Sequence, residues 1–187
     1  MGKEYAIPHT LSGQDIRDLR AKLNISRADF ASLAGVSVKT VQYWENGAKE
    51  ITGPVVFLYR ILSANILLTD SLEIPPQEYP LRLKYYYKSM LCTLIDVDEA
   101  RQLVKIRNYT EKLQYRAFGP IEHPDYTQYT EFLQSRCFPE SRDKMKLELQ
   151  RLGLPFYDPL AIIEKTGGRM AEDCFRLEVE RKGLEGW

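Results

Sequence analysis

The chain has 187 residues, of which 44% are hydrophobic and 28% are charged, and this composition is typical of a globular protein with a packed core. Its 26 basic residues equal its 26 acidic residues, which excludes a uniformly basic coat for nucleic acid and confines any DNA contact to a local patch. No apolar run approaches the roughly 20 residues of a membrane span, and no apolar signal core stands near the N-terminus, so we expect a cytoplasmic protein without a membrane partner.

Four helices are predicted in the first third of the chain from their caps and apolar spacing. Ser12 and Ser26 each precede an acidic residue by three positions, which is the capping-box pattern that begins the first and second helices. Gly35 provides a tight turn to a third, short helix that Ser37 caps, and a proline opens a fourth helix, predicted over residues 54–68. The side chains predicted to face the core from the second and third helices are Phe30, Leu33, Val41 and Trp44.

The stretch SRADFASLAGVSVKTVQYWENG has the helix, glycine-containing turn and second helix of a helix-turn-helix. It closely resembles the Cro/cI-like (XRE) family, whose landmarks stand here as IRDLR at 16–20, SRADFA at 26–31, GVS at 35–37 and WENG at 44–47. The resemblance covers residues 11–66. It implies an all-helical domain that binds double-stranded DNA, in which the WE pair ties the recognition helix to its neighbours.

A recognition helix lies in the major groove with its outward side chains on the base edges. Gln42 can read adenine, Lys39 can reach guanine or a phosphate, and Val38 can contact a thymine methyl group. Thr40 is better placed for a phosphate. Arg27 stands where the family usually has glutamine, which suggests a phosphate clamp or a guanine reader. The full set of predicted DNA-binding residues is Arg27, Ser37, Val38, Lys39, Thr40, Gln42 and Tyr43.

An alternative is that this helix-turn-helix has lost DNA binding and serves only as a dimer scaffold. The outward arc of the third helix carries no acidic residue until Glu45, which favours DNA binding.

The stretch TDSLEIPPQEYP, residues 69–80, carries three prolines and no clear helical periodicity. Such a segment is typical of a linker or of a strap that crosses a surface. We therefore predict one domain over residues 1–68 and a second domain over residues 81–187.

The second domain is predicted to be α+β with a small antiparallel sheet, so the chain as a whole is α+β. LCTLIDV and QLVKIRN are expected to be strands joined by a charged turn, and LQYRAF is a candidate for a further short strand. Helices are expected in YTQYTEFLQSRCF, in SRDKMKLELQRLG after a Ser141 cap, and after Asp158. CFRLEVE alternates and is expected to be a last strand that can join the sheet.

Catalytic and metal-binding patterns are weak in this domain. Asp96, Asp98 and Glu99 form a DxDE cluster that could bind a hard metal, but acidic residues are also common in hairpin turns. His123 lies in a loop without an evident partner for acid–base work, and the three cysteines form no metal-site pattern. We predict no catalytic residue, no metal and no cofactor, and a metal-dependent nuclease that uses Asp96, Asp98 and His123 remains an alternative.

Basic and aromatic residues alternate in the first part of the second domain. This mixture can grip a phosphate backbone, stack on bases or bind an acidic protein, and it can equally be a solvated strand face. The candidate residues for a second nucleic-acid or partner surface are Lys84, Lys88, Lys105, Arg107, Lys112 and Arg116.

The sequence therefore favours a sequence-specific transcriptional regulator that acts as a homodimer and represses its own promoter, with the second domain as an effector or dimerisation module. From about residue 90 the chain also loosely resembles uncharacterised proteins of Gram-positive mobile elements, chiefly in LPFYDPLAIIEKTGGRMAEDCF. That resemblance implies a phage or mobile-element setting. It also implies an alternative, an anti-CRISPR-type inhibitor whose second domain binds a Cas effector or its guide RNA while the helix-turn-helix regulates its own gene.

Overall fold

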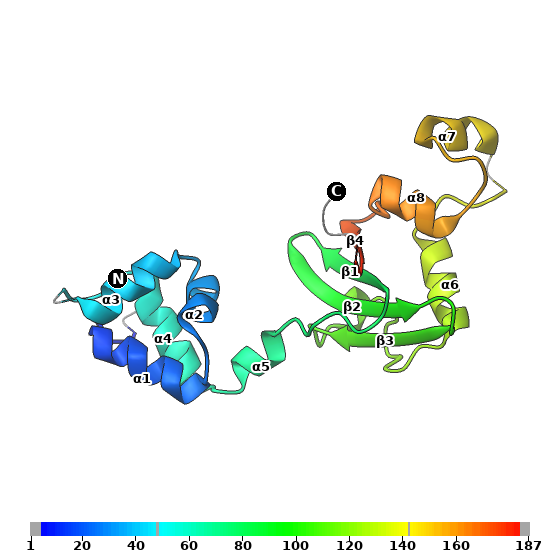
Figure 1. The fold of residues 1–187 in the computed structure, drawn as a ribbon. Helices are drawn as coiled ribbons and strands as arrows, with labels where there is room; N and C mark the ends of the chain where they lie inside the picture. The colour runs from blue at the N-terminus through cyan, green and yellow to red at the C-terminus, as the bar shows by residue number, and fades with distance from the viewer. Residues whose placement is uncertain (1–4, 48, 142, 184–187) are drawn as a thin grey trace. The chain divides into compact units, whose positions relative to one another are not determined.

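The computed structural model describes residues 5–47, 49–141 and 143–183. The chain divides between Ile74 and Pro75 into two compact units, hereafter the N-terminal and C-terminal units (Figure 1). The first is all-helical and the second combines a sheet with helices, so the predicted α+β class is confirmed.

The N-terminal unit contains α1 Gly13–Leu23, α2 Arg27–Ala34, α3 Val38–Asn46, α4 Pro54–Ala64 and the short α5 Leu68–Leu72. Both predicted capping boxes form, because the Ser12 and Ser26 side chains accept backbone N–H groups while the acidic partners accept in return. Gly35 takes the left-handed conformation, with a φ of 65°, that its turn requires.

Two details of the N-terminal unit differ from the sequence prediction. The helix expected over 54–68 begins at Pro54 as predicted, but its predicted end is wrong, because Asn65 leaves the helical region with a φ of −139° and α4 ends at Ala64. Leu33 is 36% exposed and does not face the core. The buried arc of α2 runs through Phe30, Ala31 and Ala34, and at 100° per residue Leu33 falls outside it.

In the described part of the C-terminal unit, one four-stranded sheet has the order β3-β2-β1-β4, with antiparallel neighbours throughout. Its strands are β1 Leu81–Tyr87, β2 Met90–Asp98, β3 Leu103–Asn108 and β4 Phe175–Arg181. One face of the sheet, with Leu83, Ile95 and Leu177, packs into a core that includes residues of the helices α6 Tyr126–Ser135, α7 Met145–Leu152 and α8 Pro159–Thr166. The last strand does join the sheet, beside β1.

Two predicted features of the C-terminal unit are wrong. LQYRAF is not a strand, because Leu113–Tyr115 form a 3₁₀ turn in which the Tyr115 N–H bonds to the Lys112 carbonyl. Ser141 does not cap α7. The chain turns at Lys144 with a φ of 63°, and α7 begins after it without a side-chain cap.

Residues 75–80 cross the other face of the sheet. The buried Arg82 guanidinium donates to the carbonyls of Pro75 at 2.8 Å and Pro76 at 3.1 Å. Asp96, directly opposite Arg82 on β2, accepts from Arg82 at 2.6 and 2.7 Å and from the backbone N–H of Glu78 at 3.1 Å. One buried ion pair therefore fixes this proline-rich segment to the sheet.

Candidate nucleic-acid interface

The third helix is held in place by a buried carboxylate near its C-terminal end. The Glu45 side chain is 0% exposed, and its two oxygens accept from Arg20 Nε at 2.7 Å and from Arg27 Nε at 2.5 Å. Arg17 donates to the main-chain carbonyl of the same residue. Three arginines from α1 and α2 therefore converge on the end of α3.

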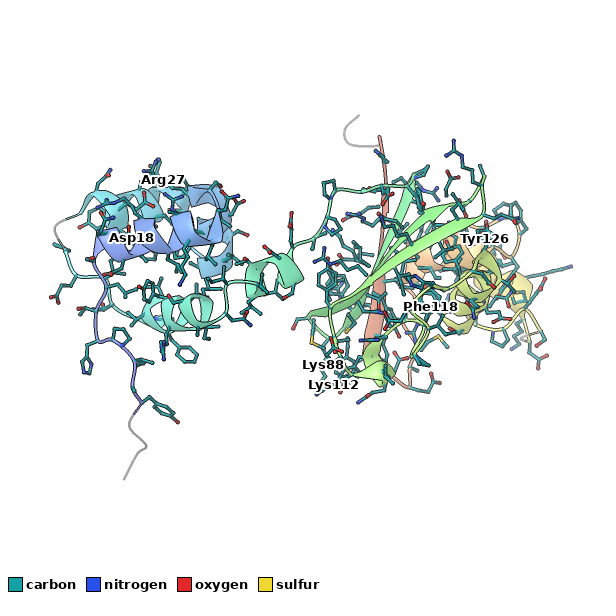
Figure 2. The ribbon with its side chains drawn as sticks, turned by 90° about the horizontal axis from the view of Figure 1, so that it is seen from below. Asp18, Arg27, Lys88, Lys112, Phe118 and Tyr126 are labelled. Carbon is teal, nitrogen blue, oxygen red and sulfur yellow. The ribbon has the colours of Figure 1, made fainter. Side chains whose placement is uncertain are left out.

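The ionisation of Glu45 follows from these partners. Burial alone would raise the pKa of its carboxyl group, but hydrogen bonds from Arg20 and Arg27 outweigh burial and hold the pKa below the ordinary value of 4.5. Arg20 is largely enclosed and also donates to the Ile25 carbonyl at 2.9 Å. The Arg27 side chain is 47% exposed, and Figure 2 shows it at the surface of the N-terminal unit.

The packing of α1 against α3 requires a glycine. A Cβ atom on Gly13 would lie 2.2 Å from the main-chain carbonyl oxygen of Trp44, which is far inside the contact limit. Only glycine lets the start of α1 approach the end of α3 this closely. Gly13 and Arg17 thus position the recognition helix, although neither belongs to the predicted site.

The two sides of α3 have opposite exposure. Val41 is fully buried, whereas Val38 is 40% exposed and Tyr43 is 58% exposed. Lys39 and Gln42 are exposed on the same outward arc. The four side chains with the strongest sequence case for base contact are therefore open to solvent within this unit.

Ser37 and Thr40 serve the start of the helix. The Ser37 hydroxyl accepts from the Thr40 N–H at 3.1 Å, and the two hydroxyl oxygens lie 2.9 Å apart. Thr40 is half-buried. Their hydroxyl groups are thus already engaged in the cap, which limits them to a secondary part in contact with DNA.

The six basic residues proposed for a second surface do not form one open patch. Lys84 pairs with Glu180 at 2.5 Å, Lys105 pairs with Glu78, and Arg116 pairs with Glu111 and Glu122. Arg107 lies over the Tyr109 ring, 5.4 Å from its centroid.

The structure does bring two of the six together. Lys88 lies over the Tyr87 ring and Lys112 over the Tyr115 ring, each 5.5 Å from the centroid. These two rings stack with their centroids 4.3 Å apart.

The acidic residues on which the nuclease alternative depends are already bound by other groups of the protein. Asp96 is bound by Arg82, and Asp98 accepts from the backbone N–H of Arg101 at 3.1 Å, while His123 is exposed. Among residues 5–47, 49–141 and 143–183, no group of three or more His, Cys, Asp or Glu side chains could hold a metal ion. In the same residues, no helix is long and apolar enough to cross a membrane.

Comparison with known proteins identifies a family for part of the N-terminal unit. A family model described as Helix-turn-helix matches residues 16–59, from the second turn of α1 to the middle of α4, and no curated protein matches the chain. The match gives no support to the resemblance of the C-terminal half to mobile-element proteins. This family is a DNA-binding domain without enzymatic activity. The chain thus contains a Cro/cI-like helix-turn-helix of the XRE family and is a DNA-binding transcription regulator.

Proposed function

We propose that the chain is a sequence-specific regulator that reads base edges with Val38, Lys39, Gln42 and Tyr43. The carrying observation is the two-sided character of α3, which exposes these side chains while Val41 and Glu45 anchor the opposite side. The exposed amide, amine and apolar groups suit adenine, guanine and the thymine methyl group in a major groove.

Contact with the DNA backbone is proposed for Arg27, supported by Ser37 and Thr40. Arg27 is bound to Glu45 through Nε, which orients its half-exposed guanidinium beside the recognition helix. A guanidinium held in this way suits a phosphate oxygen. Arg20 and Arg27 contact the Glu45 carboxylate and Arg17 contacts its main-chain carbonyl, so three positive charges surround one negative charge and supply the local positive charge that the neutral chain lacks as a whole.

A homodimer is proposed because two copies can place two recognition helices in successive major grooves, about 34 Å apart. An apolar stripe on α4 supports the idea. Phe57 is 56% exposed and Ile61 is 37% exposed, and Ala64 continues their face at helical spacing. A self-complementary apolar stripe fits a two-fold interface with a second copy. Phe57→Glu with Ile61→Glu should halve the mass measured by light scattering, and an unchanged dimer would refute this interface.

We propose that the operator lies in the promoter of the chain's own gene and that the C-terminal unit is an effector or dimerisation module. The inhibitor alternative loses three of its six candidate contacts, since Lys84, Lys105 and Arg116 are already paired within the unit. The nuclease alternative is weakened too, because the Asp96 charge is offset by Arg82.

The test compares two double variants of the full chain by fluorescence anisotropy on a labelled promoter duplex. Lys39→Ala with Gln42→Ala should abolish specific binding with little change in melting temperature, because both side chains are exposed. Lys22→Ala with Lys49→Ala removes two basic side chains from exposed positions of the same unit outside α3 and should retain binding. Equal affinity of the two double variants would refute the assignment of the reading face.

A further inference from the structure

A cavity in the C-terminal unit lies apart from the helix-turn-helix and has no role in the proposed function. The turn after β1 packs on the segment before β4, where the Lys88 N–H donates to the Cys174 carbonyl at 2.9 Å. The cavity beside this contact measures about 400 Å³. Its lining includes Lys88, Arg169, Met170, Asp173, Phe175 and Arg176.

The lining carries an excess of positive charge. The Asp173 carboxylate is bound by the buried Arg136 guanidinium at 2.6 and 3.2 Å, and this contact holds the Asp173 pKa below its ordinary value. Arg176 pairs with Glu178. Lys88 and Arg169 are exposed, and neither forms an ion pair with any residue that the structure describes. Two positive charges at the cavity therefore lack a counter-charge.

The walls of the cavity are fixed and partly apolar. Arg136 also donates to the Gly168 carbonyl at 3.1 and 2.7 Å, which fastens the segment that carries Arg169. Phe175 stacks on Tyr85 with ring centroids 4.9 Å apart. Met170 adds a further apolar surface. A site that is held in shape before binding loses less entropy when a ligand enters.

A third cation lies near the same end of the sheet. The stacked rings of Tyr87 and Tyr115 carry Lys88 and Lys112, and Figure 2 shows these two lysines together. Lys112 forms no ion pair with a described residue. It strengthens the positive field at the cavity mouth.

We propose that this cavity binds a phosphate monoester attached to a flat organic group, that is, the monophosphate end of a nucleotide. A phosphate monoester carries a charge of about −1.5 to −2 near neutral pH, which matches two unpaired cations better than a singly charged carboxylate does. Phe175 and Met170 supply an apolar surface for the attached ring. A volume of about 400 Å³ falls within the range of small-molecule sites.

The experiment is calorimetric titration of the full chain with adenosine 5′-monophosphate, with adenosine as the uncharged control. A short single-stranded oligonucleotide, with and without a 5′-phosphate, distinguishes a free nucleotide from a strand end as the source of the monoester. Lys88→Gln with Arg169→Gln removes the two unpaired charges, while Arg101→Gln removes an exposed charge at the opposite end of the β1–β2 hairpin.

We expect saturable binding of at least one monoester, no binding of adenosine, at least a tenfold loss in the double variant, and no loss in Arg101→Gln. Circular dichroism melting of each variant should match the wild type, because the substituted side chains are exposed. The proposal is overturned if neither monoester binds, if adenosine binds as tightly as its monophosphate, or if the double variant binds as well as Arg101→Gln. An oligonucleotide that binds equally without its 5′-phosphate excludes a strand end and leaves the free nucleotide as the source. Since the helix-turn-helix is unaltered in these variants, promoter binding remains a separate readout.

Discussion

Replacement of Glu45 by glutamine tests how the recognition helix is held. The carboxylate is fully buried and accepts one charge-assisted hydrogen bond each from Arg20 and Arg27. Glutamine keeps the size of the side chain, but it can accept from only one guanidinium and turns its own N–H donors toward the other. We therefore expect the N-terminal unit to lose stability.

The size of the loss follows from the two bonds. Each hydrogen bond to a charged group contributes roughly 1.5–3 kcal/mol, and loss of one partner from a buried pair costs about 3–5 kcal/mol. The Arg27 side chain is 47% exposed and can bind water in the variant, so the loss of its hydrogen bond should cost an amount at the low end of the range for one bond. A loss of about 2–4 kcal/mol is expected in Glu45→Gln. With a urea m-value near 1 kcal/mol/M for so small a unit, the midpoint should fall by roughly 2–4 M.

Urea unfolding followed by Trp44 fluorescence measures this loss in the N-terminal unit. The chain has two tryptophans, so both wild type and variant carry Trp187→Phe to leave Trp44 as the single reporter. Glu50→Gln, at an exposed position of the same unit, is the matched control and should change the midpoint little. A drop below about 0.5 kcal/mol in Glu45→Gln would refute the anchoring role.

The effect of pH gives a second check on the same variant. Because the folded-state pKa of Glu45 is lowered from 4.5, its stabilising contribution is complete above that value and is lost as pH falls through the lowered pKa. The difference between wild type and Glu45→Gln should therefore be largest near pH 7 and shrink in acid. A difference that stays constant to pH 2.5 would contradict the ion pairing.

Three further substitutions have defined outcomes. Gly13→Ala should destabilise the N-terminal unit by about 1–3 kcal/mol in the same urea assay, because its Cβ atom would meet the Trp44 carbonyl; equal or greater stability would contradict that close contact. Asp96→Asn should lower the free energy of unfolding of the C-terminal unit by about 3–5 kcal/mol, because it leaves Arg82 buried without a counter-charge. The double variant Asp96→Leu with Arg82→Met removes both charges and should lower it by less, as measured by circular dichroism unfolding. Arg136→Lys should increase hydrogen exchange at Phe175, whose N–H bonds to the Asp173 carboxylate that Arg136 holds; unchanged protection there would count against this role.

Much of the N-terminal unit could be predicted because its signals are local. A capping box spans four residues, and the turn at Gly35 needs a φ that glycine adopts readily, so neighbouring letters suffice to place α1, α2 and α3. The prediction for Leu33 was wrong because the burial of a side chain at the edge of a helix face depends on which neighbouring helices pack against it. The family resemblance implied that Glu45 ties the helix to its neighbours, but the parts played by Arg17 and Gly13 could not be predicted, since these residues meet the end of α3 only after the helices pack.

The C-terminal unit was harder to predict because its contacts depend on strand register. Arg82 and Asp96 face each other only in the observed β1–β2 pairing, and Lys84 reaches Glu180 only because β4 lies beside β1. Charges that look free along the sequence are therefore neutralised in the fold. The cavity went unseen for the same reason, since Lys88 and Arg169 come from segments far apart in the chain.

The central claim is that the exposed arc of α3 reads a DNA sequence, and selection from a random library of DNA duplexes tests it most directly. The wild-type chain should enrich one motif, and Lys39→Ala with Gln42→Ala should enrich no motif or a different one. Enrichment of the same motif by both proteins, or of none by the wild type, would contradict the claim.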